Sequence, residues 1–261
     1  MTGVQTCALP IYNRKLTDLV SLQGEITRDV SQKLRAQLSG TDEQKLAKNY
    51  TNNVEAYQLY LKGRYHYFKL TQPEIRKGIA LYQQAIEADP AYALAYAGMA
   101  DAYRTLPIAG YVRSKDAFPQ AKSAAMRALE IDENLAEAHM VLGWVGFLFD
   151  WDWSASESEL KKAIELSPNN SDAHRAYAHL LSVLGRHDEA IAEAKRAREL
   201  DPLTLITNAL EGQFLFYAGH NDEAIARLKK TLEIDSNFWI AHNILGRVYI
   251  SQGATTKLSP N

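Results

Sequence analysis

Three glycines, Gly185, Gly219 and Gly253, stand 34 residues apart in this chain. The residues after the first two also repeat, as Arg-His-Asp-Glu-Ala-Ile-Ala and then His-Asn-Asp-Glu-Ala-Ile-Ala. A fixed period of this size is typical of a solenoid, in which each unit is one small supersecondary element. A unit of this length holds two helices of about 12–15 residues and two short turns. Glycine after the first helix suits a left-handed C-cap, so the period predicts an all-α chain built from helix pairs.

Small and large residues occur in a fixed order within each unit. In the first helix, a polar or bulky residue is followed by another large residue, a small residue and, in most units, a further large residue. The first-helix sets of units three to six are His139, Leu142, Gly143 and Gly146; His174, Tyr177, Ala178 and Leu181; Asn208, Glu211, Gly212 and Leu215; and His242, Leu245, Gly246 and Tyr249. This order resembles the tetratricopeptide repeat family over residues 53–253, in about five and a half repeats. The resemblance implies an all-α, right-handed helical-repeat solenoid, the TPR superhelix.

The repeated small residues predict close helix packing. Ala178, Gly212 and Gly246 in first helices, with Ala190 and Ala224 in second helices, let the two helices of a unit approach each other. Larger residues fill the remaining space, as ridges fill grooves. One unit cannot bury its own apolar face, so neighbouring units must stack.

Seven histidines raise the question of a metal or catalytic site. His139, His174 and His242 fall at one repeat position, which favours residues packed between helices. His174 and His179 are five residues apart, so they do not share a helix face as two ligands four apart would. The sequence has no phosphate loop, no Gly-x-Ser-x-Gly elbow and no kinase motif. We therefore expect no catalytic residues, no metal, no cofactor and no enzyme activity.

The composition limits the kinds of partner that this chain can bind. The net charge is −2 and the isoelectric point about 6.4, which argues against a nucleic-acid-binding surface in this region. No run approaches the length of a membrane-spanning helix, and no signal peptide is visible. The sequence leaves the compartment open. A cytoplasmic location is favoured, and the periplasmic part of a membrane-anchored protein is the alternative.

The two ends differ from the repeats. Residues 1–11, which contain the single Cys7, match no other part of the chain, and we expect them to be a non-native segment. Residues 12–52 predict one amphipathic helix and a polar linker. This helix resembles the last helix of the TolB-like domain that precedes such repeats in bacterial serine/threonine kinases and winged-helix regulators. Residues 254–261 are expected to be a truncated tail. The last helix would then lack a capping element, and its exposed apolar face would favour self-association.

The resemblance also implies a partner-binding groove. Four positions of each first helix line the concave face in the family. The groove residues expected here are Tyr60, Arg64, Tyr67, Arg104, Met140, Trp144, Phe147, Arg175, His179, Gln213, Phe216, Asn243 and Arg247. Aromatic and methionine side chains beside arginine and glutamine suit an extended or helical peptide. For Phe147 and Phe216, internal packing is an equally open interpretation.

The predicted function is that of a protein–protein interaction scaffold that binds a peptide or partner segment in this groove. An alternative is a regulatory or sensor arm of a multidomain bacterial kinase or transcription regulator. A third is a fragment of an enzyme whose catalytic domain lies upstream.

The turn in unit three contains a tryptophan pair and a capping-box spacing. The pair Trp151 and Trp153 is either an exposed aromatic anchor or a staple that holds the turn against a neighbouring unit. Ser154 and Glu157 have capping-box spacing, which predicts that the second helix of this unit begins at Ser154.

Overall fold

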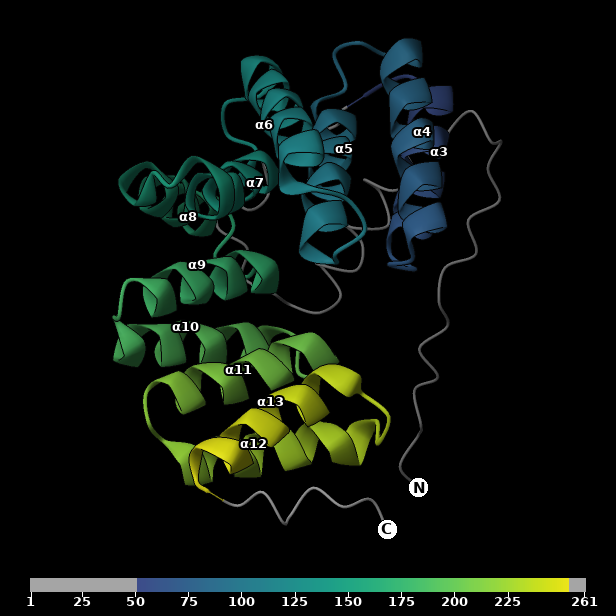
Figure 1. Cartoon of the computed structure of the whole chain (residues 1–261). Coiled ribbons are helices and arrows are strands. Elements are labelled where there is room, and N and C mark those ends of the chain that lie inside the picture. The colour runs from purple at the N-terminus through teal and green to yellow at the C-terminus, as the bar shows by residue number, and fades with distance from the viewer. Residues whose placement is uncertain (1–50, 254–261) are drawn as a thin grey trace, which may run out of the picture. The chain divides into compact units, whose positions relative to one another are not determined.

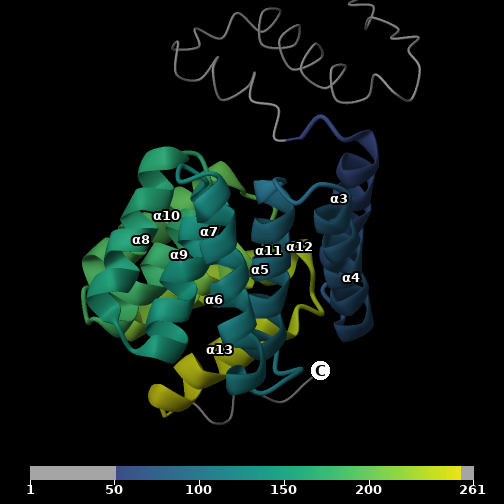
Figure 2. The same cartoon turned by 90° about the horizontal axis from the view of Figure 1, so that it is seen from above.

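The computed structural model describes residues 51–253, which contain helices and no strand (Figures 1 and 2). This confirms the all-α class. The segments expected at 1–11 and 254–261, and the helix expected within 12–52, lie outside the described residues. The helices are α3 (Val54–Tyr67), α4 (Gln72–Ala88), α5 (Ala93–Ile108), α6 (Ser114–Ile131), α7 (Ala136–Val145), the π-helix η2 (Gly146–Asp150), α8 (Trp153–Leu166), α9 (Ser171–Val183), α10 (His187–Leu200), α11 (Leu205–Tyr217), α12 (Asn221–Ile234) and α13 (Trp239–Ser251).

The chain divides into two compact units, one up to Gly98 and one from Met99 onward. In the first unit, α3 packs on α4. In the second, α7 pairs with α8, α9 with α10, and α11 with α12, and each pair also contacts the next. Figure 1 shows α9 to α12, in green, lying one beside the next, with α13 in yellow next to α11 and α12. Paired helices that stack on their neighbours form a helical-repeat solenoid, as the period predicts.

The small residues of the first helices lie where a larger side chain would collide. A Cβ atom added to Gly143 would lie 2.4 Å from Cγ of Leu160 on α8. One added to Gly212 would lie 2.7 Å from Cγ of Leu228 on α12. Each glycine therefore receives a buried leucine of its own second helix, which is the close packing that the repeat pattern predicts.

The repeated histidines do more than fill space. His139 Nδ1 lies 2.6 Å from the Glu159 carboxylate, and its Nε2 lies 3.0 Å from the carbonyl of Glu133. His174 makes the same two contacts, with Glu193 and with the Pro168 carbonyl. The hydrogen bond to Glu159 raises the pKa of His139, because the protonated ring donates to both acceptors. This repeat position thus ties a first helix to its second helix and to the preceding turn.

A π-helix at the end of the third first helix was not expected from the sequence. It spans Gly146–Asp150 and directly continues α7. The small residues Gly143 and Ala178 are 35 residues apart, whereas Ala178 and Gly212 are 34 apart. A π-turn takes up one extra residue within a helix. The longer spacing was therefore the sequence signal for it.

The turn after η2 differs from the turns after α9 and α11, and like the turn after α3, where Leu70 has φ 53°, it places a non-glycine residue in the left-handed region. Gly185 and Gly219 occupy the positive-φ position after their first helices, at φ 75° and 83°. In unit three this position is held by Trp151, at φ 59°, and its side chain is 72% exposed. The exposure favours the aromatic anchor over the staple. The capping prediction at Ser154 is wrong, because α8 begins at Trp153 and the side chain of Asp152 accepts the hydrogen bond from the Ala155 amide.

Replacing Trp151 by glycine is expected to raise the free energy of unfolding by about 0.5–1 kcal/mol, because glycine adopts a left-handed conformation without steric strain. The opposite change, Gly185→Ala, is expected to lower it by about 1 kcal/mol. Nothing lies within 4 Å of a Cβ at Gly185, so that loss would be conformational. Urea unfolding of both variants measures the change in the free energy of unfolding, which should be positive for Trp151→Gly and negative for Gly185→Ala. A destabilised Trp151→Gly variant would mean that the indole contributes packing after all.

The last described helix keeps part of its surface uncovered. Ala241, Ile244 and Val248 of α13 are buried. Trp239 and Ile250 are 70% and 59% exposed. Self-association through this helix stays a prediction.

Candidate functional site

Trp144 lies at the centre of a cluster of cations and rings in the second unit. The Arg104 guanidinium carbon is 5.1 Å from the centroid of its indole ring, and that of Arg175 is 5.9 Å away. The ring of His179 lies 5.1 Å from the indole. We call these four residues the Trp144 cluster. The indole is 4% exposed, and within residues 51–253 its buried Nε1 has no hydrogen-bond partner.

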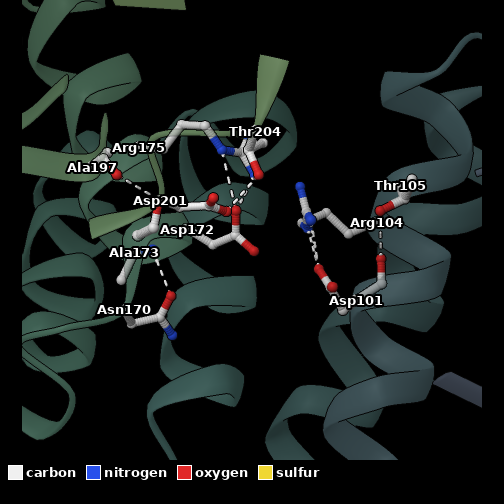
Figure 3. A network of polar contacts seen from close by, with 11 residues as sticks. Asp101, Arg104, Thr105, Asn170, Asp172, Ala173, Arg175, Ala197, Asp201 and Thr204 are labelled. Carbon is white, nitrogen blue, oxygen red and sulfur yellow. Dashed lines mark hydrogen bonds and ion pairs between the residues drawn. The ribbon is translucent and has the colours of Figure 1, made fainter. Parts of the chain in front are cut away.

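An aspartate one turn before each arginine holds its side chain. Arg104 Nε donates to Asp101 Oδ1 at 2.7 Å, and Arg175 Nη2 donates to Asp172 Oδ1 at 2.7 Å. In Figure 3 the Arg104 side chain extends from α5 toward Asp172 and the end of Arg175. The Asn170 side chain caps the first turn of α9 by accepting from the Ala173 amide, as Figure 3 also shows. Two short-range ion pairs therefore orient both guanidinium groups.

The charges in this cluster are well defined. Burial, followed by the positive charges of Arg175 and Arg104, lowers the pKa of His179 to about 3. His179 is therefore neutral at pH 7. Desolvation by the surrounding chain acts to raise the pKa of Asp172, but the charge and hydrogen bond of Arg175 and the charge of Arg104 outweigh it, so the pKa is lowered. Asp172 is 57% exposed and ionised, which makes it an accessible acceptor beside two cations.

A second cluster lies on α11 and α13. Gln213 Nε2 donates to Tyr217 Oη at 3.0 Å, and Arg247 Nη2 donates to the same oxygen at 3.3 Å. The Arg247 guanidinium carbon is 5.6 Å from the Tyr217 ring centroid and 5.9 Å from that of Phe216. We call these four residues the Tyr217 cluster. Tyr217 is 39% exposed and Arg247 is exposed, so this cluster is accessible.

Ring contacts extend from the Trp144 cluster onto α11. His179 meets the Phe214 ring edge-on at 5.0 Å, and Phe214 is buried. First helices α5, α7, α9 and α11 are thus linked through their side chains. Trp144 and Phe214 are both buried, so these contacts lie in the interior, and a common groove surface on the first helices stays a prediction.

The structure brings some of the expected groove residues together and buries others. In the second unit, Arg104, Trp144, Arg175 and His179 come together, as do Gln213, Phe216 and Arg247, while Asn243 is exposed on α13. Met140 and Phe147 are buried in the core around Leu160 and Leu181, so for Phe147 internal packing is what is observed. Phe216 packs partly against the core around Leu228 and partly under Arg247.

The remaining three expected residues belong to the first unit. Tyr60 and Tyr67 are each 9% exposed, and the Tyr60 ring contacts those of Tyr82 and Tyr92. Arg64 is exposed above Tyr60 and Phe68. Tyr217 was missed, because it lies one residue beyond the groove position of Phe216. Its spacing of four from Gln213 was the available signal.

Residues 51–253 contain neither a metal site nor a membrane span. They hold no group of three or more histidine, cysteine, aspartate or glutamate side chains placed to bind a metal ion. Within the same range, no helix has the length and apolar character needed to span a membrane.

Comparison with known proteins places the repeats in a family. A tetratricopeptide-repeat model matches residues 159–192, and another matches residues 210–257. The transcriptional regulator HilA of Salmonella typhimurium is 24% identical over 140 residues, 54% of this chain and 25% of HilA. The chain thus spans about a quarter of the length of this curated relative.

Solved structures show the same fold. TTC0263, a TPR protein of Thermus thermophilus, is similar with a TM-score of 0.60 at 19% identity, covering 75% of this chain and 99% of that protein. The human IFIT1 dimer with m7Gppp-AAAA gives a TM-score of 0.64 at 15% identity, covering 90% of this chain and 52% of IFIT1. Together with the family models, this fold supports a protein–protein interaction scaffold. From its repeat pattern, its stacked helix pairs and these matches, the chain is a tetratricopeptide-repeat protein.

Proposed function

We propose that the face shared by the Trp144 and Tyr217 clusters binds a polypeptide segment, with the Tyr217 cluster as its accessible contact. One observation carries the proposal. Arg247 lies over two rings and shares the Tyr217 hydroxyl with Gln213, while Tyr217 and Arg247 stay open to solvent. Tyrosine and arginine are the residues in which binding energy concentrates at protein interfaces.

The two clusters have different roles in this proposal. The side chains of Arg104 and Trp144 are at least nine-tenths buried, so they shape the surface rather than cover a ligand. Asp172 and the Tyr217 cluster supply acceptors and donors at the surface. A peptide would therefore place an apolar side chain on Phe216 and Tyr217 and its polar groups against Gln213, Arg247 and Asp172.

Replacing Tyr217 and Arg247 by alanine is expected to weaken peptide binding at least about tenfold, because rings and guanidinium would both be lost. A phage-displayed library of random 12-residue peptides, panned on the full chain, supplies the ligands. Their affinities for the variant are then measured by fluorescence anisotropy.

Arg113→Ala is the matched control, since Arg113 is an arginine, 73% exposed, that lies outside both clusters. Its affinity for each peptide should stay at the wild-type value. If the double variant keeps its circular dichroism spectrum and still binds the selected peptides with wild-type affinity, the assignment of this face is wrong.

A second candidate function is a regulatory arm of a larger bacterial protein. The match to HilA, which is a transcriptional regulator about four times the length of the matched segment, favours it. Reading the gene on both sides of this chain tests it, because a winged-helix or kinase domain in the same reading frame is the expected result.

A further inference from the structure

Helix α3 carries a second apolar stripe besides the one that it buries. Helix α3 packs on α4, and its buried residues are Ala56, Tyr60, Gly63 and Tyr67. Leu61, Tyr65 and Phe68 are spaced as one helix face and are 39%, 64% and 60% exposed. Large apolar side chains gathered on one exposed face indicate an interaction surface.

The same face is covered in later repeats. Residues two before and two after the small residue of a first helix pack against the preceding second helix. Around Gly212 these are Leu210 and Phe214, which share a core with Ala194 of α10. Around Ala178 they are Ala176 and Leu180, which share a core with Leu160 and Ala163 of α8. Around Gly63, the corresponding residues are Leu61 and Tyr65.

Polar contacts accompany this packing. The residue just before the small one reaches the preceding second helix. The Tyr177 hydroxyl donates to Glu157 of α8 at 2.8 Å, and Arg198 of α10 donates to Glu211 at 2.6 Å. On α3 this residue is Lys62, which is exposed and makes no ion pair within residues 51–253.

The charges next to the stripe are positive. Arg64 lies over the Phe68 ring, 5.3 Å from its centroid, and has no carboxylate within ion-pair distance in the part of the chain that the structure describes. Lys69 lies over the Tyr65 ring and pairs with Glu74 at 2.7 Å. Lys62 and Arg64, which have no carboxylate partner among residues 51–253, lie beside an apolar stripe and favour a covering element that carries carboxylates.

We propose that this face of α3 binds an acidic amphipathic helix of a partner protein, which docks where later repeats have a preceding second helix. Its apolar stripe packs on Leu61 and Tyr65, and its carboxylates pair with Lys62 and Arg64. The chain's own residues 12–38 fit less well, because they hold five basic against three acidic residues. This surface shares no residue with the Trp144 and Tyr217 clusters.

A phage-displayed library of 18-residue amphipathic helices tests the proposal. Each member has a fixed leucine stripe, with the remaining positions randomised among Glu, Asp, Lys, Arg and Gln. Panning on the full chain is expected to enrich acidic members. Their binding should slow hydrogen exchange in α3. The Lys62→Glu variant should bind them at least about tenfold more weakly and should select basic members instead.

Lys230→Glu is the control, since Lys230 is an exposed lysine on α12, and it should leave the affinity unchanged. The proposal is overturned by no enrichment, by enrichment of basic or neutral members on the wild-type chain, or by protection outside α3. It is equally overturned if a peptide of residues 12–38 binds this face as tightly as the acidic members do.

Discussion

Replacing Glu211 by leucine is expected to lower the free energy of unfolding by about 3 kcal/mol. The Glu211 side chain is 6% exposed and lies between two arginines of successive second helices. Arg198 Nε donates to its Oε2 at 2.6 Å. Arg227 Nε is 3.0 Å from the same atom, in a geometry that makes no hydrogen bond and supplies charge only. Without the carboxylate, two mostly buried guanidinium groups would repel each other.

Urea unfolding of the variant measures this loss. Glu199→Leu is the control, because Glu199 is exposed on α10, and it should change stability by no more than about 0.5 kcal/mol. A triple variant in which Arg198 and Arg227 also become leucine should recover most of the loss, since an apolar set can replace a buried ion triad. If the triple variant is as unstable as Glu211→Leu, charge compensation is not what Glu211 provides.

The contact between Gly143 and Leu160 predicts a second large effect, with a coupling that can be measured. Leu160→Ala should lower the free energy of unfolding by about 2–5 kcal/mol, because Leu160 is fully buried and leaves a cavity. Gly143→Ala should lower it by about 2 kcal/mol, because the new methyl group would collide with Leu160 Cγ.

The double variant should be more stable than the sum of the two losses predicts, by at least about 1 kcal/mol. The alanine methyl at position 143 would enter the space that the leucine leaves. Thermal unfolding of the four proteins gives the coupling energy. Strictly additive losses would show that the two residues do not share this space.

The helical-repeat fold could be predicted from the sequence because the same packing contacts recur in each 34-residue repeat. Gly143, Ala178 and Gly212 each face their own second helix, so small residues at this period indicate the first helices. Gly185 and Gly219 mark the turns for the same reason, since a left-handed residue is needed at one place in each unit. These positions are local and recurrent, and a single unit predicts the next.

The candidate site was predictable only in part. The repeat pattern indicates Trp144 as a groove residue, but the structure buries it beside Arg104 and Arg175 from neighbouring helices, and no single repeat specifies these contacts. Tyr217 joins the surface through Arg247, 30 residues later in the chain. Contacts between repeats involve residues that differ from one unit to the next, so a period cannot predict them.

The π-turn of η2 has a consequence for helical phase. Each residue added to an ordinary α-helix rotates the next stretch of chain by about 100° around the helix axis. The π-helix Gly146–Asp150 accommodates the extra residue. The helices from α8 onward can therefore keep the orientation that they would have with a regular 34-residue repeat. Arg175 can then approach the Trp144 ring from the next first helix. A repeat can in this way gain one residue within a helix while the helices before and after it keep their packing, so insertions need not be confined to turns.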